Sequence, residues 1–109
     1  MVRHAIPQVI NDRLISSVGA TEYLRTIDVG SEAWYAWLNE PGTHSFAFQS
    51  QEGRFTARRE HSHGNRYWYA YRSQHGQLHK IYLGKSEQLT LLRLQEATTI
   101  LSANGTPPP

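Results

Sequence analysis

Basic and aromatic side chains are concentrated in one stretch of the chain, residues 54–85. This stretch holds seven of the eleven Lys and Arg residues and one of the nine acidic residues, so its formal charge is +6, whereas the rest of the chain carries −4. The aromatic residues interspersed among these charges are Tyr67, Trp68, Tyr69, Tyr71 and Tyr82. Lys and Arg neutralise phosphates, and tyrosines hydrogen-bond to phosphates or stack on unpaired bases. The stretch therefore predicts a surface for a polyanion such as nucleic acid.

Other kinds of site find little support in the sequence. The candidates for metal ligands are His61, His63, His75 and His79, but zinc sites need three or four ligands at a recognisable spacing, and the chain has no cysteine. We interpret these histidines as polar loop residues and expect no metal and no cofactor. The motifs GxSxG, GxxxxGK[ST] and GxGxxG are absent, and no nucleophile with its base can be placed. We expect a protein without catalytic residues or enzyme activity.

Length and composition limit the class of protein. A chain of 109 residues, of which 39% are apolar and 11% aromatic, can build one small domain around a single core. No stretch approaches the roughly 20 apolar residues of a membrane span, and the first residues lack the apolar segment of a signal peptide. The absence of cysteine excludes disulfides. These features predict a cytoplasmic protein that does not bind membranes.

Helix signals lie on both sides of a run of strand signals. A short helix is predicted from the candidate N-cap Ser31 to the stop at Glu40-Pro41-Gly42, with an apolar stripe of Ala33, Trp34, Trp37 and Leu38. A second helix begins after either Ser86 or Thr90, and its stripe consists of Leu91, Leu94, Ala97, Thr98 and Leu101. We expect both stripes to face a common core.

Four strand signals lie between the helices, at residues 45–49, 55–60, 67–72 and 78–83. Turn signals separate them at residues 51–53, 61–65 and 75–76, which is the spacing of an antiparallel meander. The predicted fold class is α+β: a four-stranded antiparallel meander with a C-terminal helix packed on one face and a short N-terminal helix. The predicted organisation is an N-terminal arm or tail (1–26), a single domain (27–104) and a Pro-rich linker or tail (105–109).

The turn at His75-Gly76 determines which side chains share a face. If these two residues form the loop, Arg72 pairs with His79, Ala70 with Ile81 and Trp68 with Leu83. Trp68 then lies on the apolar face, and the tyrosines at 69, 71 and 82 lie on the other. A five-residue loop would instead turn Tyr69 and Tyr71 inward. We favour the first register because it buries fewer hydroxyl groups.

A similar turn at Glu52-Gly53 pairs Phe48 with Ala57, and places Arg54 and Arg58 on the tyrosine side. Arg59 and Arg72 fall on the core side, near strand ends. We therefore predict that nucleic acid is bound by a basic, tyrosine-rich sheet face and its rim, consisting of Arg54, Arg58, Tyr69, Tyr71, Lys80 and Tyr82, with Arg66 and Lys85 at the rim. Duplex DNA is the expected partner, because a sheet of two or three strands fits the major groove. The alternatives are single-strand binding through stacking, a protein-binding face, and a solvated face without a partner.

The sequence resembles an N-terminal module of large bacterial LuxR/MalT-type transcriptional regulators. The resemblance covers about residues 29–103 and is carried by the runs VGSEAWYAWLNE, SFAFQSQEGRFTARRE and GNRYWYAYRSQHGQLHKIYLGKSEQLTLLRLQEA. In those proteins a similar segment precedes an ATPase region. The resemblance implies a role in transcriptional regulation, with a downstream ATPase or effector region as a partner. The alternative to DNA binding is a protein-interaction or sensory module that regulates an attached effector.

A second resemblance is topological. A basic sheet followed by a helix, with the runs YWYAYR and GQLHKIYLGK, is similar to the arm-type DNA-binding domains of phage and transposon integrases. In those domains a three-stranded sheet enters the major groove and a helix supports its back, which implies that the predicted sheet-face residues contact DNA. This chain departs from the pattern by an additional N-terminal helix and first strand, and by a high density of tyrosines.

Overall fold

The computed structural model describes residues 6–17 and 24–104. Within these residues, seven strands form one sheet, accompanied by two α-helices and a short 3-10 helix. The strands are β1 (Gln8–Ile10), β2 (Arg13–Ser17), β3 (Leu24–Asp28), β4 (Ser45–Ser50), β5 (Gly53–Ser62), β6 (Asn65–Gln74) and β7 (Gln77–Gly84). The helices are α1 (Glu32–Leu38), η1 (Ser86–Gln88) and α2 (Leu91–Asn104). The predicted tail at residues 105–109 and two parts of the predicted arm, residues 1–5 and 18–23, lie outside the described residues.

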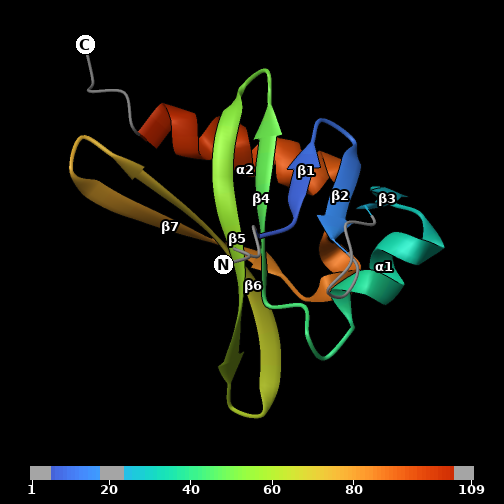
Figure 1. The fold of residues 1–109 in the computed structure, drawn as a ribbon. Helices are drawn as coiled ribbons and strands as arrows, with labels where there is room; N and C mark the ends of the chain where they lie inside the picture. Colours follow the sequence, from blue (N-terminus) through green and yellow to red (C-terminus); the bar gives the residue numbers. More distant parts are fainter. Residues whose placement is uncertain (1–5, 18–23, 105–109) are drawn as a thin grey trace, which may run out of the picture.

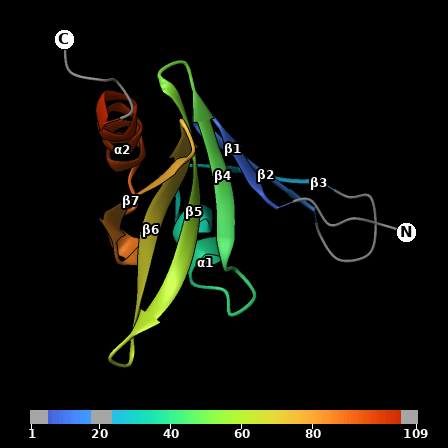
Figure 2. The same cartoon turned by 90° about the vertical axis from the view of Figure 1, so that its left-hand side faces the viewer.

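The sheet is mixed, and its strand order differs from the sequence order. The strands are arranged β3-β2-β1-β4-β5-β6-β7; β1 and β4 are parallel, and all other neighbours are antiparallel. Helix α2 crosses behind β5, β4 and β1 in Figure 1, and Figure 2 shows it beside β6 and β7. The apolar residues of one sheet face and of the helices form a single core.

The predicted fold class is wrong, because the sheet is not a four-stranded antiparallel meander. The four predicted strands correspond to β4–β7, but β1, β2 and most of β3 come from the segment predicted as an arm. Val9 and Leu14 are fully buried, which explains why this segment joins the sheet. Pro7 immediately precedes β1, and its carbonyl accepts a hydrogen bond of 2.8 Å from Ala47 N, so the proline begins the strand without interrupting the ladder.

The register predicted for the β6–β7 hairpin is confirmed in its main part. Arg72 pairs with His79 and Ala70 with Ile81, but an irregularity at Trp68/Tyr69 pairs Trp68 with Gly84 instead of Leu83. The turn residues His75 and Gly76 have φ values of 50° and 77°. Two successive left-handed residues form the tight turn that matches the twist of a hairpin.

Two other predicted connections are wrong in detail. In the β4–β5 hairpin Phe48 pairs with Phe55, not with Ala57, so the register differs by two residues. A shift of two keeps every side chain on its predicted face, because side chains alternate with a period of two. The predicted connection 61–65 is shorter than expected. Ser62 pairs with Asn65, so His63-Gly64 alone form the turn between β5 and β6.

Both helices begin at residues that the sequence indicated. Ser31 caps α1, and its Oγ accepts a hydrogen bond of 3.3 Å from Trp34 N. Of the two candidates for the second cap, Thr90 precedes α2, and its Oγ1 accepts a hydrogen bond of 3.1 Å from Arg93 N. Ser86 instead begins η1, and its buried hydroxyl contacts Trp68.

The core is built around aromatic side chains from α1, β4 and β6. The ring centroid of Phe46 lies 5.5 Å from that of Trp34 and 5.3 Å from that of Trp68. The indole N–H groups of Trp34 and Trp68 have acceptors: Trp34 Nε1 donates to the Leu89 carbonyl at 2.8 Å, and Trp68 Nε1 donates to Ser86 Oγ at 3.0 Å. These two tryptophans therefore fill the core without leaving a buried donor unpaired.

Replacing Trp68 tests the assignment of the two sheet faces. We expect Trp68→Ala to lower the free energy of unfolding by about 3–5 kcal/mol, because it leaves a large cavity in the core. The matched control is Tyr69→Ala on the opposite face, for which we expect a loss of about 1 kcal/mol or less. Urea unfolding measures both. Equal losses for the two variants would contradict the assignment.

Candidate functional site

The candidate site is the outer face of the sheet, defined as the side turned away from the core on β5, β6 and β7. Its residues alternate along the strands with buried ones such as Phe55, Trp68 and Ala70. The outer face consists of Arg54, Thr56, Arg58, Glu60, Tyr67, Tyr69, Tyr71, Leu78, Lys80 and Tyr82. The structure thus places six of the eight predicted contact residues on one surface.

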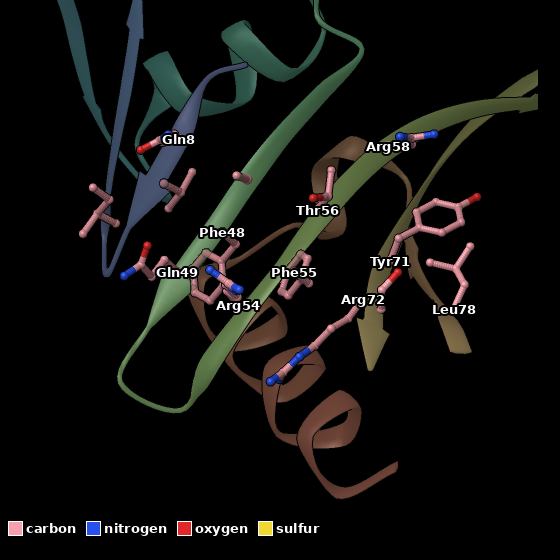
Figure 3. Close-up of a pocket in the computed structure, with 14 residues that line it drawn as sticks. Gln8, Phe48, Gln49, Arg54, Phe55, Thr56, Arg58, Tyr71, Arg72 and Leu78 are labelled. Atoms are coloured by element: carbon pink, nitrogen blue, oxygen red, sulfur yellow. The ribbon is translucent and has the colours of Figure 1, made fainter. Parts of the chain in front are cut away.

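An open hollow of ≈ 650 Å³ lies beside these residues, where β1, β4, β5, β6 and β7 contribute to its lining. Figure 3 shows Arg54, Thr56 and Arg58 following one another along β5, with Tyr71 of β6 beside Arg58. Gln8 of β1 and Gln49 of β4 also line the hollow, and Gln49 is the cross-strand partner of Arg54. Arg72 also contributes to the lining, but its guanidinium donates to Ser102 Oγ at 3.0 Å. The hollow therefore brings the guanidinium groups of Arg54 and Arg58 together with amide and hydroxyl groups, a set rich in hydrogen-bond donors.

Arg54 and Arg58 are the cations of the outer face that have no acidic partner within the described residues. Both are exposed, and the Arg58 guanidinium lies 5.6 Å from the ring centroid of Tyr71. Arg13, also on a strand, lies 3.5 Å from Asp28 instead. An arginine without an acidic partner keeps its charge available for an anionic ligand.

The sequence interpretation missed Glu60, whose carboxylate lies inside the tyrosine cluster. Lys80 Nζ is 3.2 Å from Glu60 Oε1, and the Tyr71 hydroxyl donates a short hydrogen bond to Glu60 Oε2. The Lys80 ammonium also lies 4.3 Å from the ring centroid of Tyr69. Glu60 therefore offsets the charge of Lys80. The positive charge of the outer face that is not offset in this way belongs to Arg54 and Arg58, which line the hollow.

The aromatic side chains at the β6–β7 end form a continuous surface. The ring of Tyr82 lies between those of Tyr67 and Tyr69, at centroid distances of 5.9 Å and 5.6 Å. Tyr82 is 48% exposed, and Leu78 on the same edge strand is 64% exposed. This part of the outer face offers aromatic and apolar surface, whereas the hollow offers charge.

Arg59 and Arg72 lie on the core side, as the alternation predicts. The Arg59 guanidinium donates to the carbonyls of Leu38 and Glu40 at 2.5 Å and 3.0 Å, and lies 5.7 Å from the Trp68 ring centroid. Burial, together with the nearby charge of Arg66, lowers the pKa of Arg59 from its ordinary value. Arg59 therefore connects β5 to the end of α1, and its role is structural.

Two of the predicted contact residues lie apart from the others. Arg66 pairs with His61 near the tip of the β5–β6 hairpin, and the alternation along β6 places it on the same side as Trp68. Lys85 follows the end of β7 and is the N-cap residue of η1, and its backbone N–H donates to Gln88 Oε1 at 2.9 Å. The rim predicted from the sequence is therefore not continuous with the outer face.

Within residues 6–17 and 24–104, no group of three or more His, Cys, Asp or Glu side chains could hold a metal ion. No helix in the same part of the chain is long and apolar enough to cross a membrane.

Comparison of the chain with protein-family models, with curated proteins and with solved structures finds no match. The resemblances to the regulator module and to the integrase domains therefore stay predictions.

Arg58 and Arg59 are neighbours on opposite faces of β5. Replacing each of them in turn tests which of the two guanidinium groups stabilises the fold. We expect Arg59→Met to lower the free energy of unfolding by about 1–3 kcal/mol, because two carbonyls lose their donor. The matched control Arg58→Met should change it by about 0.5 kcal/mol or less. Denaturant unfolding measures both values, and a larger loss for Arg58 than for Arg59 would contradict the assignment.

Proposed function

We propose that the chain is a non-enzymatic module that binds duplex DNA through its outer face, in the service of transcriptional regulation. The observation that carries this proposal is the pair Arg54 and Arg58, which line the hollow without an acidic partner in the described residues. Phosphates on adjoining nucleotides are the ligands that such a pair neutralises, and the counterions released on binding favour the complex.

The other groups of the hollow suit the same ligand. Thr56, Gln8 and Gln49 offer hydroxyl and amide groups, which contact phosphates and sugars in protein–DNA complexes. Tyr69 and Tyr82 extend the surface on the β7 side, and their hydroxyls are further donors for the backbone. The outer face therefore combines charge with neutral donors.

A salt-dependent titration tests this function. We expect the chain to bind a fluorescent duplex, with an affinity that falls as salt rises. The double variant Arg54→Gln/Arg58→Gln should bind more weakly and reduce the slope of log K against log [salt] by about two, roughly one for each lost phosphate contact. Fluorescence polarisation at several salt concentrations measures both quantities.

The matched control is Arg13→Gln, which removes an exposed arginine that is already paired with Asp28. Its salt slope should stay close to that of the unmodified chain. No binding at low salt would overturn the proposal, and binding that does not respond to salt would overturn the phosphate mechanism.

A second candidate function is a protein-interaction module for an attached effector. The observation that favours it is the exposure of Leu78 and Tyr82 on β7, an edge strand of the sheet. Exposed apolar side chains beside an unpaired strand edge are suited to a protein partner.

The two functions predict opposite rankings of the same variants. If a protein covers β7, Leu78→Asp/Tyr82→Asp should abolish binding to the effector region in a pull-down, and Arg54→Gln/Arg58→Gln should have little effect. Loss of effector binding in the arginine variant alone would contradict this second function.

A further inference from the structure

The β5–β6 hairpin extends beyond both neighbouring strands. Pairing of β5 with β4 ends at Arg58, and pairing of β6 with β7 ends at Trp68. Beyond these points the sheet pairs in the described residues are Glu60 with Tyr67, His61 with Arg66 and Ser62 with Asn65. Figures 1 and 2 show this end of the hairpin projecting away from α2. We call residues 60–67 the ribbon.

The dimensions of the ribbon suit one groove of duplex DNA. Two paired strands lie about 4.8 Å apart, and three residue pairs extend for roughly 10 Å. The major groove, about 12 Å wide, admits a two-stranded ribbon, whereas the minor groove is about 6 Å wide. An object of this size and shape therefore fits the wider groove.

The exposed side chains of the ribbon are donors of the kinds that read base edges. His61, His63, Asn65 and Arg66 are all exposed, and Arg66 has no acidic partner within the described residues. Arginine pairs with guanine and asparagine with adenine in the major groove. Glu60, the acid of the ribbon, is held by Lys80 and Tyr71 at its base, away from the tip.

The edges and the charge distribution of the ribbon support the same partner. Beyond Arg59 and before Trp68 the strands have no neighbour in the sheet, so backbone N–H groups along both edges are open to phosphates. Arg59 and Arg66 also lie close enough to repel each other. Arg66 therefore adds to the positive charge of this part of the chain, which favours a polyanionic partner.

We propose that the tip of the ribbon enters the major groove of duplex DNA, while Arg54 and Arg58 further along β5 hold the adjoining phosphates. Asn65 and Arg66, which lie on opposite faces of the hairpin next to its turn, would then reach base edges on either side of the tip. This inference rests on the proposed function and adds the element that enters the groove and the residues that read the bases.

Blocking one groove tests the inference. Two duplexes of identical sequence are compared, one of them with glucosylated 5-hydroxymethylcytosine, which fills the major groove and leaves the number of phosphates unchanged. We expect binding to the modified duplex to be at least about tenfold weaker, a loss of about 1.4 kcal/mol. Asn65→Ala/Arg66→Gln should weaken binding to the unmodified duplex by a similar factor, and should lower binding to the modified duplex much less.

Arg13→Gln is again the matched control, since it removes an exposed basic residue that lies outside the ribbon and is paired with Asp28. Urea unfolding of all variants checks that the fold is retained. Equal affinity for the two duplexes, with the salt dependence intact, would overturn the ribbon inference and leave the proposed function standing. Absence of salt-dependent binding to either duplex would overturn both.

Discussion

The burial of Trp68 determines how the rest of the sheet is oriented. Its ring lies against Phe46, and its indole N–H reaches Ser86 Oγ, so the side chain has one position that satisfies both its apolar and its polar parts. Because successive side chains of a strand point to opposite faces, this position sends Tyr67, Tyr69 and Tyr71 to the other side. The β7 strand, paired to β6, then adds Lys80 and Tyr82 to the same surface. The candidate site is thus a consequence of core packing.

Much of the C-terminal part of the fold could be predicted from local sequence signals. Turn residues such as His75-Gly76 and a cap such as Ser31 act through neighbours a few residues away, and their effects are visible in the sequence. The strands β1, β2 and β3 could not be predicted in this way, since they contain three to five residues and show little alternation. Moreover, β1 is stabilised by β4, a partner distant in the sequence.

The candidate site was predictable where alternation alone decides it. Arg54 and Arg58 occupy even positions of β5, and Arg59 occupies an odd one, so they lie on opposite faces of the strand. This alternation distinguishes the two arginines that can bind an anion from the one that stabilises the fold. The position of Glu60 could not be derived, because its carboxylate reaches Tyr71 and Lys80, which are not its partner across the strands. Arg66 was predicted to lie at the rim of the outer face because of its charge. It is two residues from Trp68 on β6, however, so the alternation places it on the side of Trp68.

The parallel pairing of β1 with β4 has a consequence for the order in which the chain folds. Gln8 meets Ala47, and β3 and α1 lie between the two strands in the sequence. A contact across such a separation pays a loop-closure entropy before it contributes stability, so it forms late. During synthesis the β1–β2 hairpin emerges first but has no neighbour on its β1 side until residues 45–50 have left the ribosome. Once β4–β7 have also emerged, their local hairpins can form first, and β1 then completes the sheet by closing onto the free edge of β4.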